Sequence, residues 1–388
     1  MDIREVTEKA KAIKPADRQA IIKARERQAS LAKPPGSLGL LEEMAVRIAG
    51  MTGCVINRIG KGCVAVFCAD NGVTREGVAS APQSVTRAQT INFTRRLTGV
   101  GALARSYDSE LLIVDVGVKD PIPKNLYADE PLKDTAKIVN RRIRQEGQTD
   151  NLAEGPAMTK EEVLQAIETG IEMADAVKRE GFSILGVGEM GIGNTTTSAA
   201  VLSAITGKDS EYTVGRGGGV NDGGFARKKE IVDNASAKYR KEGGILKTPE
   251  GERTERMIEA LATMGGFDIC AMTGAYLGAA ANRMPAVIDG YISAVAALAA
   301  YVIAPAAADY MIASHKSFEK GYLLAVETLG LEPFLSLDMR LGEGSGCPIA
   351  FSVIRGACDV MADMATFEEA EINDDYLEEI RSDEKYQR

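Results

Sequence analysis

The chain has 388 residues, 45% of them apolar, with 46 Lys and Arg against 55 Asp and Glu and a formal net charge of −9 at pH 7. This length suits one large α/β domain with a subdomain, and the acidic balance would repel a phosphate backbone, which argues against nucleic acid as a partner. The single histidine, His315, excludes a multi-histidine zinc site within one subunit.

Two short amphipathic helices are predicted within residues 4–29, where Ala, Ile and Val recur at helical spacing and Pro15 marks a fresh start. The N-terminus is charged from its second residue and has no apolar signal core, and the six cysteines form no C-x-x-C pair. We therefore expect a cytoplasmic protein with reduced thiols. A break at 33–39 leads into an apolar-periodic helix over 40–51, which Gly53 closes.

Four short apolar runs, at 63–68, 111–115, 183–187 and 285–288, each end at Gly or Asp and are separated by helical stretches. Uninterrupted β-branched runs are typical of parallel strands buried on both faces. The predicted fold class is therefore α/β, a wound, mostly parallel sheet flanked by helices. Ligands of such sheets bind beyond the carboxyl ends of the strands, and the polar, Gly-rich segments fall there, so we expect the site at that edge.

Four other segments are expected away from the site. Residues 119–150 are polar and irregular, and 227–255 form a charged helical run broken by two glycines, so both look peripheral. The stretch 291–308 lacks charge, but its nine alanines and one proline favour a buried helix over a membrane span. The acidic segment 368–388 is expected to be a solvated helix or a frayed tail.

The segment 186–197 is rich in Gly and Thr, follows a predicted strand and opens a helix over 198–205. Backbone N–H groups at a helix start attract an anion and threonine hydroxyls add donors, so a phosphate is predicted here. The segment lacks the Lys-Ser/Thr of a Walker loop and departs from G-x-G-x-x-G. A tight turn that needs glycine only for packing is the alternative.

Glu343 stands between two glycines, directly before an apolar helix predicted over 348–364. A general base is a natural role, since glycines let a substrate approach and an apolar wall raises a carboxylate's pKa. The alternative is an acidic side chain whose negative charge interacts favourably with the positive N-terminal end of the helix dipole. No acid pair follows a strand, so no metal is implied.

Further polar segments have two interpretations each. The cluster 215–222 either wraps substrate or is a flexible loop, and Asp70 and Asp289 at strand ends either hold ribose hydroxyls or cap turns. His315 is interpreted as a hydrogen-bonded structural residue.

Together these motifs resemble the nicotinate-nucleotide:dimethylbenzimidazole phosphoribosyltransferase family, and the similarity runs over most of the chain. Its landmarks are KPPGSLG at 33–39, DNGV at 70–73, PQSVT at 82–86, and the segments 151–159, 188–196, 265–268, 314–319 and 340–346.

The resemblance implies a smaller helical domain built from both chain ends, residues 1–30 with 347–388, and a large α/β domain over 31–346. It implies transfer of phosphoribose from nicotinate mononucleotide to an aromatic base for cobamide synthesis, without a cofactor or metal. The subunits are expected to form a homodimer, or to pair with a paralogue. A non-catalytic nucleotide-binding protein and a nucleotide phosphorylase or hydrolase are the alternatives.

The resemblance also assigns residues. It makes Glu343 the base that takes the ring proton of the attacking benzimidazole, and Glu189 the second carboxylate. The implied substrate and phosphate positions are Gly191, Gly193, Asn194, Thr195, Thr196, Gly217, Gly218, Asp289, Gly290 and Ser317. The base pocket comprises Ala81, Gln89, Met190 and Leu341; because Ala81 and Met190 depart from the family pattern, the physiological base stays open.

Overall fold

The structure, a computed structural model, describes residues 1–377. At its centre lies a seven-stranded sheet in the order β3-β4-β2-β1-β5-β6-β7, in which every neighbouring pair is parallel. The strands found by their apolar runs are β1 (Gly62–Ala69), β2 (Ser109–Gly117), β5 (Ile184–Met190) and β6 (Ala286–Ile288). The predicted wound α/β class is confirmed.

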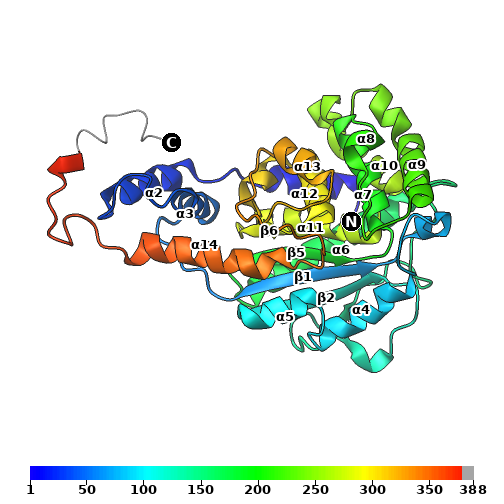
Figure 1. The fold of residues 1–388 in the computed structure, drawn as a ribbon, viewed down its shortest axis with the longest axis horizontal. Helices are drawn as coiled ribbons and strands as arrows, with labels where there is room; N and C mark the ends of the chain where they lie inside the picture. The colour runs from blue at the N-terminus through cyan, green and yellow to red at the C-terminus, as the bar shows by residue number, and fades with distance from the viewer. Residues whose placement is uncertain (378–388) are drawn as a thin grey trace.

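Helices cover both faces of the sheet, which is why all eight residues of β1 are buried. One face carries α11 (Phe267–Ala281) and α12 (Tyr291–Ile303), with α6 (Lys160–Arg179) packed behind α11. The other carries α4 (Ser84–Thr94), α5 (Gly99–Ser106) and α14 (Gly346–Asp363). Figure 1 shows α11 and α12 above the strands and α4 and α5 below them.

Close packing on the first face depends on small residues. A Cβ atom added at Gly170 of α6 would lie 1.8 Å from the carbonyl oxygen of Ala271, so these two helices touch backbone to backbone. Of the uncharged stretch 291–308 predicted as a buried helix, residues 291–303 form α12, which is buried, and a 3-10 turn begins at Pro305. Among residues 1–377, no helix is long and apolar enough to cross a bilayer.

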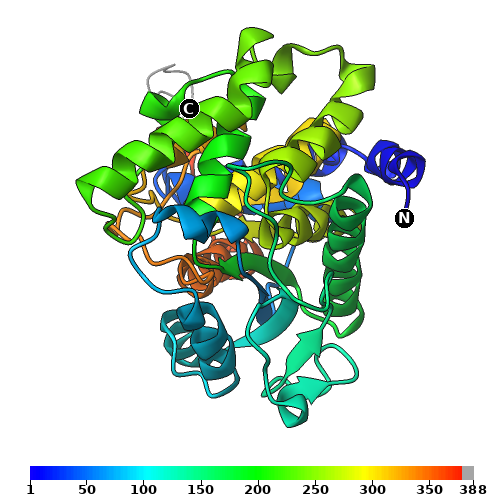
Figure 2. The same ribbon diagram turned by 90° about the vertical axis from the view of Figure 1, so that its right-hand side faces the viewer.

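Three short strands went unpredicted. The segment 119–150, expected to be irregular and peripheral, adds β3 (Tyr127–Ala128) and β4 (Ile138–Asn140) to one sheet edge, seen at the bottom of Figure 2. The third is β7 (Met311–Ala313), at the other edge. Strands of two or three residues are too short to show a period-2 pattern, so only their tertiary pairing identifies them.

Five more helices and five short 3-10 turns belong to the described part of the chain. They are α7 (Asn194–Thr206), α8 (Ser210–Thr213), α9 (Asp222–Lys241), α10 (Glu250–Met264) and α13 (Tyr322–Thr328), with short 3-10 turns at Gly72–Glu76, Lys124–Leu126, Ile245–Lys247, Pro305–Tyr310 and Asp375–Leu377. The charged run breaks at Gly243 and Gly244 as expected, since both have positive φ.

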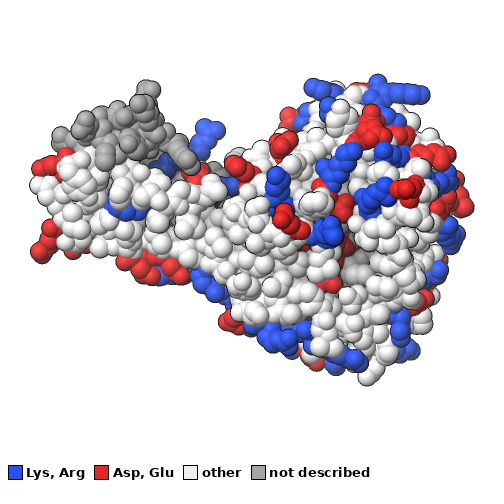
Figure 3. Space-filling model, viewed as in Figure 1, with Lys and Arg blue, Asp and Glu red and all other residues white. Residues whose placement is uncertain are grey.

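Both chain ends contribute to an arm that projects from the body (Figure 1). We define the arm as α2 (Arg18–Ser30), α3 (Leu40–Thr52) and the part of α14 packed against α3. Backbone bonds from Ala32 N to Ala365 O, 2.9 Å, and from Phe367 N to Ser30 O, 3.0 Å, join the two ends. The face of the arm seen in Figure 3 is largely uncharged.

The first helix, α1 (Ile3–Ala12), packs instead against α10 and α11 of the body. The helices expected within 4–29 and 40–51 are thus confirmed, whereas the division into two domains stays a prediction. Of the acidic segment 368–388, residues 378–388 lie outside the described part of the chain, and the described part holds only the turn Asp375–Leu377.

Candidate active site

A cavity of about 280 Å³ lies where β5, β6 and β7 end. Segments from six parts of the chain line it, namely 78–89, 189–195, 216–218, 289–293, 315–319 and 340–343. Every predicted site residue except Thr196 belongs to this lining. Thr196 is buried inside α7, where its Oγ1 has no hydrogen-bond partner among the described residues. The functional roles of the lining residues stay predictions.

Glu343 is 4% exposed and its backbone has φ +64°, between two glycines that also have positive φ. Its carboxylate accepts hydrogen bonds from Val100 N, 3.1 Å from Oε2, and from Gln89 Nε2, 3.4 Å from Oε1. Burial raises its pKa above the ordinary value, and the Val100 N–H works against that rise. A carboxylate so placed can accept a proton from a bound molecule.

Glu189 has a different setting at the end of β5. Asn194 donates to its Oε2 and also to Asp268 Oδ2, 3.0 Å away, so one amide bridges two buried carboxylates. Burial, followed by the charge of Asp268, raises the pKa of Glu189 to about 8. Glu189 is therefore mostly protonated at pH 7, which suits a hydrogen-bond donor rather than a base.

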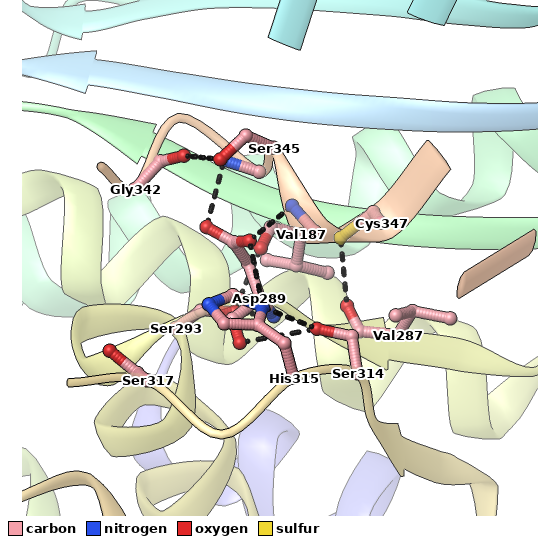
Figure 4. Close-up of polar contacts among 12 residues, drawn as sticks. Val187, Val287, Asp289, Ser293, Ser314, His315, Ser317, Gly342, Ser345 and Cys347 are labelled. Carbon is pink, nitrogen blue, oxygen red and sulfur yellow. Dashed lines mark hydrogen bonds and ion pairs between the residues drawn. The ribbon is translucent and has the colours of Figure 1, made fainter. Parts of the chain in front are cut away.

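Asp289 and His315 both line the cavity and lie side by side (Figure 4), with His315 Nδ1 3.9 Å from Asp289 Oδ1. Burial raises the pKa of Asp289 to about 7, opposed by the backbone N–H groups of Gly346 and Gly344. Burial lowers the pKa of His315 to about 4, so the imidazole is neutral at pH 7. Its Nδ1 lies 3.1 Å from Ser314 Oγ, and its ring stacks against Tyr322 at 6.4 Å. These contacts agree with a hydrogen-bonded structural histidine that also lines the cavity.

The start of α7 forms another wall. Gly193 is its N-cap, with φ +96°, and makes no side-chain cap bond. Thr195 Oγ1 accepts from Lys228 Nζ at 2.7 Å, and the same ammonium donates to Gly215 O at 3.2 Å. A helix start, a hydroxyl and an ammonium together can bind an anion.

Lys228 is a residue that sequence reasoning missed. The run 227–255 was expected to be peripheral, which is wrong for α9, because α9 packs against α7 and leaves Lys228 only 1% exposed. Burial lowers its pKa to about 8. Lys228 sits within Arg-Lys-Lys, a pattern typical of a solvated helix face, so no local signal distinguishes it.

Two arginines of the lining were also not singled out. Arg216 is held by Asp222 at 2.6 Å, and the guanidinium of Arg340 lies 5.5 Å from the centre of the Phe318 ring.

No cluster of three Asp, Glu, His or Cys side chains suited to a metal ion occurs within residues 1–377.

Part of the cavity lining is apolar. Its side chains are those of Val78, Ala81, Val85, Met190, Ile192 and Leu341. Leu341 is 58% exposed, so this wall opens directly to the surface. A flat aromatic ring fits such a surface, and Glu343 would lie at its edge.

Comparisons with known proteins agree with one another. A family model described as "Phosphoribosyltransferase" matches residues 13–372. The chain is 48% identical to the nicotinate-nucleotide–dimethylbenzimidazole phosphoribosyltransferase of Clostridium perfringens, over 98% of this chain and 99% of the relative. It is 44% identical to the protein of that name from Clostridium tetani, over 95% and 96%. The crystal structure of CobT from Thermus thermophilus matches with a TM-score of 0.82 and 38% identity, covering 92% of this chain and 99% of that one.

Proposed function

The chain belongs to the nicotinate-nucleotide–dimethylbenzimidazole phosphoribosyltransferase family, and we propose that it moves phosphoribose from nicotinate mononucleotide to an aromatic base within the cavity described above. The resemblance drawn from the sequence motifs is thereby confirmed. The chain is an enzyme that transfers a pentosyl group in the synthesis of the lower ligand of cobamides.

In the reaction, one ring nitrogen of the base forms a bond to C1′ of nicotinate mononucleotide. The bond from C1′ to the pyridinium nitrogen breaks, and its electron pair leaves with nicotinate, whose ring becomes neutral. Attack from the opposite face turns a β-nucleotide into an α-nucleotide. The other ring nitrogen of the base gives its proton to Glu343. Because the leaving ring takes up no proton, the step needs no general acid.

One observation carries this proposal: Glu343 lines the cavity close to the apolar side chain of Leu341, with its carboxylate held at both oxygens and its pKa raised by burial. These contacts orient a proton acceptor toward the edge of a flat ring. Glu189, with its pKa near 8, would stay uncharged and hold Asn194, which opens α7. The two carboxylates of the cavity therefore have different proposed roles, Glu343 as a proton acceptor and Glu189 as the partner of Asn194.

The nucleotide phosphate is assigned to the start of α7. Thr195 and the backbone of Gly191 and Gly193 supply donors, and Lys228, which donates to Thr195 Oγ1 from outside the lining, adds a positive charge. Gly217 allows a phosphate to approach, since a Cβ there would lie 3.0 Å from Thr195 Oγ1. Gly218, Gly290 and Ser317, also in the lining, remain candidates for ribose contacts.

We also propose a homodimer. Leu341 on the cavity wall is 58% exposed, and Leu97, two residues before the Gly99 that lies against Leu341, is 67% exposed, so two exposed leucines lie on one side of the site mouth. Ile22 and Leu40 on the arm are exposed as well. A second copy covering both surfaces would bury them, and sedimentation should give twice the 41.3 kDa chain mass. Monomeric protein that gains mass and activity only with a paralogue would favour the heterodimer.

The cytoplasmic location and the absence of a cofactor or metal stay predictions. Assaying the chain after dialysis against a chelator tests the second, with full activity expected.

The reaction itself is tested by product analysis. Purified chain, nicotinate mononucleotide and 5,6-dimethylbenzimidazole should give equal amounts of nicotinate and an α-nucleotide, with none of either when the base is omitted. Nicotinate released without base would indicate a hydrolase, and release that requires inorganic phosphate a phosphorylase. Binding without turnover would indicate a nucleotide-binding protein.

A further inference from the structure

Asp289, at the end of β6, holds the turn that carries Glu343. Its Oδ2 accepts from Gly344 N at 3.0 Å, and its Oδ1 accepts from Gly346 N at 2.7 Å. Asp289 is 2% exposed, and its carboxylate points toward the turn and the start of α14 (Figure 4). Both oxygens of one side chain therefore bind the backbone just after Glu343.

The turn needs such support because its conformation is unfavourable for Glu343. Gly342, Glu343 and Gly344 have φ of 85°, 64° and 82°, and a side chain in this left-handed region is strained unless the surroundings fix it. Ser345 closes the turn from within, donating from its Oγ to Gly342 O at 2.7 Å. A second fixed point is the carboxylate of Asp289.

Asp289 is itself anchored to the sheet. Its N–H donates to Ser293 Oγ at 3.1 Å, and that hydroxyl donates to Val187 O of β5 at 2.8 Å. Ser314 Oγ, just beyond β7, donates to Asp289 O at 3.3 Å. These bonds tie the position of the carboxylate to three neighbouring strands.

The turn also lies directly on β5. A Cβ atom added at Gly188 would be 2.5 Å from Gly344 N, so backbone meets backbone there. The turn is thus fixed from below by the strand and from the side by Asp289. Little freedom is left in the direction that the Glu343 side chain takes.

We infer that Asp289 is a positioning residue, which fixes the turn 342–346 by two backbone hydrogen bonds and so aims the Glu343 carboxylate at the ring proton of the bound base. This inference rests on the proposed role of Glu343. It differs from the family resemblance, which places Asp289 among substrate-lining positions.

Asp289→Asn tests this with little change of shape. An amide has one oxygen acceptor and one NH₂ donor, so one backbone N–H of the turn would face another donor. Misplacing a catalytic group by about 1 Å can cost about 10²-fold in rate, so we expect kcat to fall by about 10²-fold while KM for nicotinate mononucleotide stays within about threefold.

A matched control is Asp115→Asn. Asp115, in β2, is also buried and also accepts from two backbone N–H groups, Gly117 N at 3.1 Å and Val118 N at 2.9 Å. Unlike Asp289, it does not line the cavity. Its kcat should stay within about threefold of the parent enzyme, because neutralising a buried carboxylate elsewhere leaves Glu343 in place.

A double-mutant cycle with Glu343→Gln separates the possible roles. If Asp289 acts through Glu343, Asp289→Asn adds at most about threefold to the loss in kcat already caused by Glu343→Gln. A full additional loss, or a large rise in KM for the nucleotide, would mean that Asp289 contacts substrate and would overturn the inference.

If Asp289→Asn does not fold, Ser345→Ala tests the same inference, because it removes the hydrogen bond from Ser345 Oγ to Gly342 O within the turn. It should lower kcat severalfold at unchanged KM, again without adding to Glu343→Gln, and an unchanged kcat would overturn the inference. Normal turnover by Glu343→Gln alone would instead refute the proposed base, whatever the Asp289 variant does.

Discussion

Lys228→Met should weaken nucleotide binding without unfolding the protein. The ammonium lies 2.7 Å from Thr195 Oγ1 and the residue is 1% exposed, so we expect its charge to act on a phosphate at the start of α7 away from bulk water. A hydrogen bond to a charged group contributes about 1.5 to 3 kcal/mol, and about 1.4 kcal/mol is tenfold, so Kd for nicotinate mononucleotide should rise about 10- to 150-fold. Methionine fills similar space and removes a buried charge, so the fold should persist.

The same lysine predicts a pH dependence. Burial lowers its pKa to about 8 in the unliganded protein. A lysine is charged below its pKa and neutral above it, so the attraction for phosphate is present below pH 8 and is lost as the pH rises through that value. Kd of the parent enzyme should therefore rise above pH 8, while that of Lys228→Met should not respond there.

Isothermal titration with nicotinate mononucleotide measures both effects. Lys229→Met is the matched control, because Lys229 follows on the same helix but pairs with Glu211 instead of Thr195. A Kd for Lys228→Met within about twofold of the parent value would refute a phosphate site beside Lys228, since such a change is far below one charged hydrogen bond.

Three further predictions follow from the site. Gly188→Ala would put a Cβ 2.5 Å from Gly344 N and should lower kcat at least about tenfold, whereas Gly155→Ala, with open space around it, should not; equal rates would contradict the close contact. Inorganic phosphate should compete with nicotinate mononucleotide in steady-state kinetics, and purely uncompetitive inhibition would argue against a site at α7. Because Ala81 leaves room and the flexible Met190 side chain adapts to the ring, the kcat/KM values for dimethylbenzimidazole and benzimidazole should lie within a factor of about 10 to 200 of each other. The kcat/KM for p-cresol should be lower than both. Activity with this phenol alone would refute the proposed base pocket.

Patterns within a few consecutive residues were sufficient to predict the central strands and the Glu343 candidate, but not the remaining features of the fold and the site. The buried strands β1, β2 and β5 appear in the sequence as apolar runs, because both of their faces are covered. Glu343 stood out because a charged residue between glycines has no packing role in a turn. Both signals lie within a few consecutive residues.

The unpredicted features depend on contacts between distant parts of the chain. Lys228 is buried only because α9 packs on α7, 33 residues earlier. The bonds from Asp289 to the turn span 55 and 57 residues. The short strands β3, β4 and β7 exist because neighbouring strands pair with them. No periodicity within these segments could have predicted such partners.

Glu343→Gln tests the central claim most directly. The substitution keeps the shape of the side chain and removes the proton acceptor, so formation of the α-nucleotide from saturating nicotinate mononucleotide and dimethylbenzimidazole should slow by about 10²-fold or more. Nucleotide affinity should stay within about threefold, because Glu343 lies on the apolar wall rather than beside the proposed phosphate site. Near-normal turnover by the purified variant would remove Glu343 from the mechanism and contradict the account.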